Sequence, residues 1–373
     1  MNKDVLFVCT YGDFLTSFEL SNISIYQKMG YRVHCACNFE DKDKNQKNEI
    51  LLEKGCILHN ISFVRTPCIQ MITNLIQLEN IIKRYNINVV DCHNAVCGVI
   101  ARIAAKRAKI RKVVYTPHSF FFYKGCPLKN KIIYKPIEML LAKYTDLLIL
   151  INNEDYQIGL KMKLRGKAIY VPGIGINMEK ILNAKSEATI RNEYNIPDEN
   201  LLFVSIGELN ANKNHESVIR ALAMLNEKKF TYIICGMGDL KEYLISVIKE
   251  CKLEKNVILA GYRTDVFLIL KEADAFIFPS FREGLSASLM EAMTCGKYCI
   301  CSKIKGNVDL INGENGMLFN PANVEEIYEC INKFINNSKQ YKQIGLSNTN
   351  EIEKYDINNV RDIMVKVYNE FLD

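Results

Sequence analysis

The chain has 373 residues, of which 49% are hydrophobic and 24% charged, so it is globular and not disordered. This length suits two domains of about 100–200 residues each. No apolar run approaches the roughly 18 residues of a membrane-spanning helix. The opening residues, MNKDVLFVCTYGD, have a short apolar stretch and no small-residue cleavage site. We therefore expect no signal peptide and a cytoplasmic protein.

Charge and cysteine usage narrow the class of protein further. Residues 1–172 hold 25 Lys and Arg against 14 Asp and Glu, whereas residues 173–373 hold 23 against 28. This asymmetry predicts that the first half meets an anionic surface. The 14 cysteines include no CxxC pair, which favours reduced thiols in the core over a zinc site.

The first half of the chain alternates apolar strands with helices. The strands expected here cover residues 5–9, 32–36, 89–91, 112–115, 147–151 and 168–171, the helices cover 18–29, 75–85 and 95–108, and residues 11–13 form a loop. Continuous apolar strands alternating with helices predict a parallel sheet that is covered on both faces.

The same pattern restarts after turn formers at 171–175 and a polar segment at 177–197. The strands expected in the second half cover residues 201–206, 232–235, 257–259, 275–278 and 298–301, with helices over 214–226 and up to about 295. We predict two Rossmann-like doubly wound α/β domains facing across a cleft, the first at 1–175 and the second at 176–350. Residues 351–373 are expected to form an amphipathic helix that packs back towards the N-terminal domain through Val360, Ile363, Met364, Val367, Phe371 and Leu372.

The most specific stretch for function is SFREGLSASLMEAMTCG at residues 280–296. Glu283 falls in a loop after a strand, and Glu291 falls in the following helix. The backbone N–H groups of Gly284, Leu285 and Ser286 are expected at the helix start, where they favour a phosphate. Taken alone, the Glu-x7-Glu spacing also fits a helix cap at Glu283 and a solvated charge at Glu291.

The surroundings of this stretch carry a family resemblance. It resembles the Glu-x7-Glu signature of retaining, two-Rossmann-domain (GT-B) glycosyltransferases of family 4. Further segments match in order: SIGELNANKNHE at 205–216, GYRTD at 261–265 and NGENG at 312–316. YTPHSFFFYKG at 115–125 and KYTD at 143–146 resemble the bacterial exopolysaccharide and capsule branch.

The resemblance implies that the domain at 1–175 binds the acceptor and the domain at 176–350 binds the nucleotide-sugar, and it implies a role for each matching residue. Glu291 would bind the ribose of the nucleotide, Glu283 the donor sugar, and Lys213 the diphosphate. His118 would hydrogen-bond the donor sugar near the reacting carbon, and Gly12 would bring a loop close to the distal phosphate. His93, at the end of a strand, fits either an acceptor contact or a structural hydrogen bond.

One residue departs from the family pattern. The family often has arginine after the glycine of the 205–216 segment, and Glu208 stands there instead. A carboxylate facing a diphosphate would repel it. Either Glu208 points away, or another cation replaces the arginine, with Arg282 the first candidate and Arg263 the second.

The mechanism follows from the charge that develops when the sugar–phosphate bond breaks. Lys213 and the helix start at 284–286 would stabilise the leaving diphosphate, so no metal and no other cofactor is expected. The resemblance implies retention of configuration. No clear nucleophile is present, which favours attack by the acceptor from the front face.

The acceptor is expected at the basic stretch, because residues 102–143 carry 11 basic side chains and one acidic one, Glu138. Aromatic residues and lysines alternate in its second part. The candidate acceptor and membrane residues are Phe121, Phe122, Tyr123, Lys124, Lys129 and Lys131. They suit an anionic bilayer and a lipid-diphosphate acceptor. A solvated basic face is the alternative, and no recognition motif supports nucleic acid binding.

The predicted protein is a glycosyltransferase on the inner face of the cytoplasmic membrane. It would move a sugar from a nucleotide donor, expected to be UDP-linked, to a lipid-linked oligosaccharide for an extracellular or capsular polysaccharide. Two alternatives stay open: a nucleotide-sugar epimerase or hydrolase on the same fold, and a catalytically silent subunit of an assembly complex. Sugar identity, linkage and oligomeric state are left open.

Overall fold

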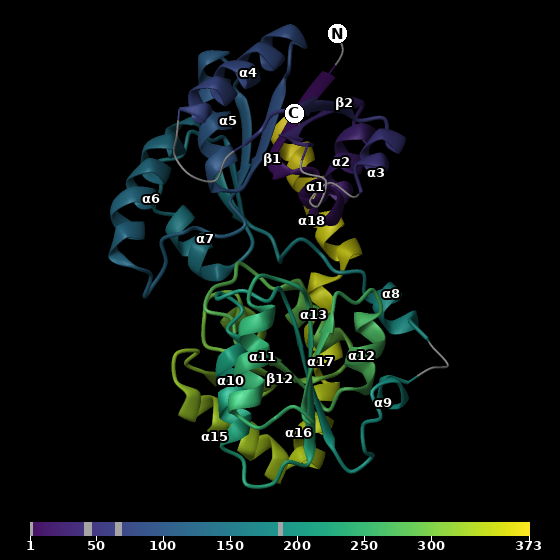
Figure 1. Cartoon of the computed structure of the whole chain (residues 1–373). Helices are drawn as coiled ribbons and strands as arrows, with labels where there is room; N and C mark the ends of the chain where they lie inside the picture. Colours follow the sequence, from purple (N-terminus) through teal and green to yellow (C-terminus); the bar gives the residue numbers. More distant parts are fainter. Residues whose placement is uncertain (1–2, 41–46, 64–68, 186–188) are drawn as a thin grey trace. The chain divides into compact units, whose positions relative to one another are not determined.

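The computed structural model describes residues 3–40, 47–63, 69–185 and 189–373. The chain divides into two compact units (Figure 1). The N-terminal unit contains Met1–Ile174 and Asn359–Asp373, and the C-terminal unit contains Gly175–Asn358. All of the last helix except its first two residues therefore belongs to the first unit.

A seven-stranded parallel sheet forms the centre of the N-terminal unit, in the order β3-β2-β1-β4-β5-β6-β7. Its strands are β1 (Lys3–Tyr11), β2 (Tyr31–Asn38), β3 (Ile57–Asn60), β4 (Val89–His93), β5 (Lys112–Thr116), β6 (Leu147–Leu150) and β7 (Lys167–Tyr170). The strand order reverses between β1 and β4. Ligands of open α/β sheets bind at such a point, beyond the carboxyl ends of the strands.

Helices cover both faces of this sheet. They are α1 (Gly12–Phe18), α2 (Leu20–Lys28), α3 (Asn48–Glu53), α4 (Gln70–Arg84), α5 (Ala95–Arg107), α6 (Leu128–Leu141), α7 (Asn153–Gly159) and α18 (Ile357–Leu372). Alternation along β1 sends Leu6 and Val8 into the core under α4 and α5, and Val5 and Phe7 into the core under α1, α2 and α18. Both faces are buried, which explains the continuous apolar strands.

The C-terminal unit repeats this architecture with six parallel strands in the order β10-β9-β8-β11-β12-β13. The strands are β8 (Leu201–Ile206), β9 (Phe230–Cys235), β10 (Val257–Gly261), β11 (Ala275–Phe278), β12 (Tyr298–Ser302) and β13 (Gly316–Phe319). The helices are α8 (Met178–Asn183), α9 (Ile190–Glu193), α10 (His215–Ala223), α11 (Lys241–Glu250), α12 (Val266–Glu272), α13 (Ala287–Thr294), α14 (Asn307–Leu310), α15 (Val324–Asn336), α16 (Ser338–Leu346) and α17 (Asn348–Glu351). The prediction of two Rossmann-like doubly wound domains is confirmed.

The loop expected at residues 11–13 and the helix expected at 18–29 were both wrong in detail. Helix α1 begins at Gly12, directly after β1, and it is separated from α2 at Glu19, whose φ of −116° and ψ of 0° interrupt the helix. Gly12 and Asp13 are turn formers in isolation. Here Asp13 occupies the first helical turn, where a negative charge is favourable. The interruption at Glu19 matters because that side chain reaches the candidate site.

The C-terminal segment is also broken where one helix was expected. Helix α17 ends at Glu351, a short 3₁₀ turn covers Glu353–Tyr355, and α18 begins at Ile357. Six predicted packing positions and one further residue, Tyr368, contribute to the same core as α1 and α2. Val360, Met364 and Tyr368 are buried there, and Ile363, Val367, Phe371 and Leu372 are partly buried.

Candidate active site

The loop after β11 leads directly into α13 in the C-terminal unit. Ser286 caps the helix, since its Oγ accepts a hydrogen bond from the backbone N–H of Leu289 at 3.4 Å. Gly306 has a φ of 79°, and a Cβ there would lie 2.2 Å from the carbonyl oxygen of Gly284. Glycine at 306 therefore allows a second loop to support Gly284 from behind. This packing holds Gly284, Leu285 and Ser286 at a helix start, where unpaired N–H groups and the helix dipole favour an anion.

Lys213 and Glu283 are brought together from two loops of this unit. Lys213 Nζ lies 2.8 Å from Glu283 Oε1, and it lies 5.0 Å from the centre of the Phe278 ring. A Cβ on Gly207 would lie 3.1 Å from the aliphatic stem of Lys213, so this glycine leaves room for the lysine. Both charged side chains are partly exposed. They therefore remain available to a ligand.

Glu208, the residue that departs from the family pattern, is exposed and faces its own loop. Its Oε2 accepts a hydrogen bond from Asn210 Nδ2 at 2.6 Å. The Glu208 carboxylate thus has the Asn210 amide as a hydrogen-bond partner within its own loop. The conformation of this loop thus fits the first of the two options stated for Glu208.

The two arginines considered as replacements differ in their surroundings. Arg263 forms ion pairs with Glu193 at 2.5 Å and with Asp265 at 2.6 Å, and both carboxylates engage it through two oxygens. Arg282 is half-buried, and its backbone carbonyl accepts a hydrogen bond from Asn212 Nδ2 at 3.0 Å. A donor-binding role for either arginine stays a prediction.

Glu291 lies half-buried in the second turn of α13. Burial raises its pKa to about 7, while the charge of Lys180 lowers it. A carboxyl group with such a pKa changes its charge near neutral pH.

The loop that carries Lys213 leads into a residue that sequence reasoning missed. His215, the first residue of α10, is buried, and its pKa is lowered to about 4 by burial and by Lys213. His215 is therefore a neutral support beneath this loop.

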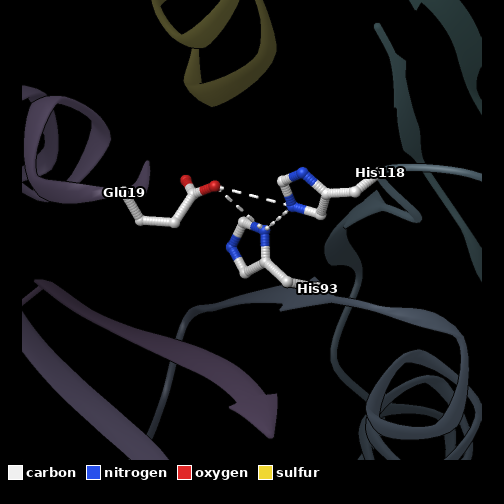
Figure 2. Close-up of side chains that lie close together, drawn as sticks. All are labelled: Glu19, His93 and His118. Atoms are coloured by element: carbon white, nitrogen blue, oxygen red, sulfur yellow. Dashed lines mark hydrogen bonds and ion pairs between the residues drawn. The ribbon is translucent and has the colours of Figure 1, made fainter. Parts of the chain in front are cut away.

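Three side chains converge at the carboxyl end of the sheet in the N-terminal unit (Figure 2). His93 ends β4, His118 follows β5, and Glu19 lies at the break between α1 and α2. His93 Nδ1 lies 3.2 Å from His118 Nε2 and 3.4 Å from Glu19 Oε1, and His118 Nε2 lies 3.6 Å from the same oxygen. His118 has a φ of 59°, a left-handed conformation that is rare outside glycine. The predicted residues His93 and His118 are thus in contact, and Gly12, the first residue of α1, is buried.

A second buried carboxyl group lies behind His93. Asp91 Oδ1 is 3.4 Å from His93 Nε2, and Asp91 Oδ2 accepts a hydrogen bond from Tyr368 Oη of α18 at 3.1 Å. The spacing Asp-x-His on a strand places both side chains on one face, and this signal could have identified Asp91. Glu19 has no such local signal.

Burial dominates the titration of this cluster. It raises the pKa of Glu19 to about 8, with Asp91 adding to the effect, and it raises the pKa of Asp91 to about 7. It lowers the pKa of His118 to about 3 and that of His93 well below its usual range. Both imidazoles are therefore neutral at pH 7, so each ring offers one nitrogen lone pair.

The predicted acceptor residues lie on and beside α6. Leu128, Ile132, Ile133 and Leu140 are 51–70% exposed there, and the flanking Lys129, Lys131 and Lys135 are exposed too. We call these seven residues the α6 face. Beside it lies a cavity of about 360 Å³ lined by Phe122, Tyr123, Lys124, Lys131, Lys135, Met139, Ile158 and Lys161. Phe122 is buried against Phe120, whereas Phe121 packs on Tyr134.

The opposite side of α6 is tied into the core by a buried ion pair. Arg102 Nη2 lies 2.7 Å from Glu138 Oε2, and Tyr115 Oη donates to Glu138 Oε1 at 2.8 Å. The Arg102 guanidinium lies 3.9 Å from the centre of the Tyr115 ring. The one acidic residue of the basic stretch is therefore internal, and the exposed side of α6 keeps only positive charge.

The comparisons with known proteins agree with this architecture. Residues 4–152 match the family described as glycosyl transferase 4-like, and residues 186–350 match the glycosyl transferases of group 1. The chain belongs to the group 1 glycosyltransferases of family 4. This glycosyltransferase is 28% identical to EpsD of Bacillus subtilis, which is named a glycosyltransferase, over 100% of this chain and 98% of EpsD. The resemblance to family 4 is confirmed.

The name of a second relative states both of its substrates. The UDP-Gal:α-D-GlcNAc-diphosphoundecaprenol α-1,3-galactosyltransferase of Escherichia coli is 29% identical over 72% of this glycosyltransferase and 73% of its own length. Among solved structures, Anabaena HepE in complex with UDP-glucose superposes with a TM-score of 0.78 at 18% identity, over 98% of this chain and 99% of HepE. This likeness confirms the GT-B fold. Within the residues that the structure describes, no helix is both long and apolar enough to span a bilayer.

Proposed function

We propose that this glycosyltransferase moves a sugar from a UDP-linked donor to a lipid-linked saccharide at the inner face of the cytoplasmic membrane, in the synthesis of an exported polysaccharide. The observation that carries the proposal is the Lys213–Glu283 pair beside the start of α13. The named substrates of the Escherichia coli relative, a UDP-sugar and a diphosphoundecaprenol-linked sugar, support the choice of donor and acceptor.

The chemistry of the proposal follows from the charge on the leaving group. The bond between the anomeric carbon and the β-phosphate oxygen breaks, and the UDP gains negative charge. Lys213 Nζ and the N–H groups at Gly284–Ser286 stabilise that charge as it develops. The acceptor hydroxyl oxygen forms the new bond on the same face, and its proton passes to the departing phosphate oxygen. These donors supply the positive charge that the scheme requires.

Four further predicted residues have a place in this scheme. Glu291 accepts hydrogen bonds from the ribose hydroxyls, and Glu283 from hydroxyls of the donor sugar. His118, neutral at pH 7, hydrogen-bonds the sugar close to the anomeric carbon. The backbone at Gly12 comes near the distal phosphate.

The α6 face supports the membrane part of the proposal. It combines exposed aliphatic side chains with lysines, a composition that suits the boundary between headgroups and acyl chains. The lysine-lined cavity beside it suits a diphosphate headgroup. Each lysine near an anionic bilayer contributes about 1 kcal/mol of attraction.

Calorimetric titration with UDP, GDP and ADP tests the donor site. We expect UDP to bind best, and Glu291→Ala to abolish or strongly weaken that binding. In the proposal, the ionised form of Glu291 accepts the ribose hydroxyls and the protonated form does not. Because the pKa of Glu291 is about 7, the affinity for UDP should fall about tenfold from pH 8 to pH 6. The phosphate of the nucleotide titrates in the same way when Glu291→Gln binds UDP. The difference between the pH profiles of the wild-type protein and Glu291→Gln therefore reports the Glu291 carboxyl group.

Three results would contradict the proposal. Equal pH profiles for the wild-type protein and Glu291→Gln would remove the ribose role of Glu291. A protein that binds UDP and releases free sugar or an epimer, with or without lipid acceptor, would be an epimerase or hydrolase. Polysaccharide assembly that continues in cells carrying Glu283→Ala would favour a silent binding subunit.

Vesicle binding tests the α6 face separately. Replacing Lys131 and Lys135 together with alanine should weaken binding to vesicles containing anionic lipid about thirtyfold, from two contributions of about 1 kcal/mol each. The measurement is sedimentation with sucrose-loaded vesicles at two salt concentrations, because the effect should shrink as salt rises. Lys249→Ala with Lys255→Ala, an exposed pair in the C-terminal unit, is the matched control. An equal loss in both double variants would overturn the assignment of this face.

A further inference from the structure

The three atoms that converge in the N-terminal unit have the spacing of ligands around one metal ion. His93 Nδ1, His118 Nε2 and Glu19 Oε1 lie 3.2, 3.4 and 3.6 Å from one another. Zinc bonds of about 2.0–2.1 Å at tetrahedral angles place neighbouring ligand atoms about 3.4 Å apart. Figure 2 shows that all three side chains point to a common position. Two histidines and one carboxylate are, moreover, a donor set that zinc accepts.

The charge of the cluster favours a bound cation. Glu19 and Asp91 are 1% and 0% exposed. Within the described residues, neither carboxyl group forms an ion pair with a lysine or an arginine. Isolated buried carboxylates are strongly unfavourable unless they are protonated or paired with a cation. A divalent ion at this position would offset that penalty.

Groups behind the three ligands would hold them in place. Asp91 Oδ1 faces His93 Nε2 at 3.4 Å, and neither of these two buried atoms has a hydrogen-bond partner among the residues that the structure describes. A carboxylate behind a metal-binding histidine fixes the tautomer that leaves the opposite nitrogen free to bind. Asn22 Nδ2 donates to Glu19 Oε2 at 2.7 Å, which leaves Oε1 towards the histidines.

Space for a fourth ligand lies beside the cluster. A cavity of about 30 Å³ is lined by Glu19, Asn22, Thr116 and His118 among others. This volume is sufficient for one water molecule, and the polar side chains within a mainly apolar lining offer it partners. Three protein ligands and one water complete a tetrahedral zinc site.

We propose that Glu19, His93 and His118 bind one zinc ion, with water as the fourth ligand, and that this ion inhibits sugar transfer by engaging His118. Zinc binding rests on the geometry, burial and charge of the cluster and does not depend on the proposed function. Inhibition rests in addition on the proposed role of His118 towards the donor. When zinc is bound at its Nε2, the His118 ring is held in place. It then loses the freedom to adjust to a sugar hydroxyl.

Metal binding is measured first, without any activity assay. The EDTA-treated and dialysed full-length protein is titrated with Co²⁺, whose visible absorption reports tetrahedral coordination, and with Zn²⁺ by calorimetry. We expect one equivalent to bind. Glu19→Gln, which keeps the size and the hydrogen-bonding capacity of the side chain, should weaken binding by more than about tenfold, since even changes behind the ligands lose 10–100-fold. Absence of a stoichiometric site, or unchanged affinity in Glu19→Gln, would overturn the proposal.

A second histidine pair provides the matched control. His34 Nδ1 lies 2.9 Å from His59 Nε2 in the same unit, but Asp4 contacts the far nitrogen of His34, so three ligand atoms do not converge there. His59→Gln should therefore bind zinc as the wild-type protein does. Loss of zinc in this variant would assign the ion to the other pair and refute the site.

For each protein separately, the rate of sugar transfer is then measured with and without zinc. A nitrilotriacetate buffer fixes the concentration of free Zn²⁺. The wild-type enzyme and His59→Gln should lose at least tenfold in rate at saturating zinc, while the ratio for Glu19→Gln should stay near one. Zinc that binds without changing the rate would overturn the inhibitory part. A zinc-free protein that transfers no sugar contradicts the proposed function instead, and the cobalt spectrum still decides the site.

Discussion

Replacing Lys213 with alanine is expected to lower kcat by about 10²–10³-fold, a loss of about 3–4 kcal/mol of transition-state stabilisation. The reason is that Lys213 Nζ is held beside the start of α13 by Glu283 at 2.8 Å and by the Phe278 ring. In the proposed reaction, the additional negative charge that Lys213 meets develops on the diphosphate as the sugar departs. Rates measured at saturating UDP-sugar and acceptor check this prediction.

The controls separate charge from folding. Lys229→Ala removes an exposed lysine of the same unit and should leave kcat within twofold. Lys213→Arg keeps the positive charge and should recover part of the rate. If Lys213→Ala raises KM and leaves kcat unchanged, the lysine binds the ground state and the transition state equally, and its proposed role fails.

The Glu138→Ala substitution is expected to destabilise the protein by about 3–5 kcal/mol, because it leaves the charge of Arg102 buried without a partner. Arg102 is 1% exposed, and Glu138 accepts hydrogen bonds from both Arg102 and Tyr115. The same pair anchors α6, so its loss should also loosen the proposed acceptor surface. Urea unfolding followed by far-ultraviolet circular dichroism measures the loss.

A surface ion pair is the contrast for this prediction. Lys83 Nζ lies 2.6 Å from Glu79 on α4, yet the lysine is 59% exposed, so Lys83→Ala should change stability by less than about 1 kcal/mol. A loss below about 1 kcal/mol in Glu138→Ala would mean that water or a rearranged side chain reaches Arg102, and that α6 does not depend on this contact.

Much of the fold was accessible from local pattern. Runs such as Val5–Cys9 and Ala275–Phe278 are apolar at every position, and that composition arises where a strand is covered on both faces. Lys213, Glu283 and Glu291 were predicted as site residues through motifs in contiguous segments. The structure places Lys213 against Glu283, but their roles towards a donor remain to be measured.

Other features depended on neighbours that are distant in the chain. Glu19 looked like an ordinary helical residue, because its contacts with His93 and His118 arise only when β1, β4 and β5 lie side by side. Likewise, the sequence shows Glu138 only as the one acidic residue of a basic stretch, and its contact with Arg102 of α5 exists only in the folded unit.

Fold class, family and motif residues could therefore be predicted before folding was considered, since apolar periodicity and contiguous motifs are local properties of a chain. Which polar side chains are buried, and which atoms they meet, became known only from the folded arrangement. The buried carboxyl groups of Glu19 and Asp91 owe their raised pKa values to desolvation, which depends on every element packed around them. No local pattern contains that information, and the convergence of Glu19, His93 and His118 likewise exists only in the folded N-terminal unit.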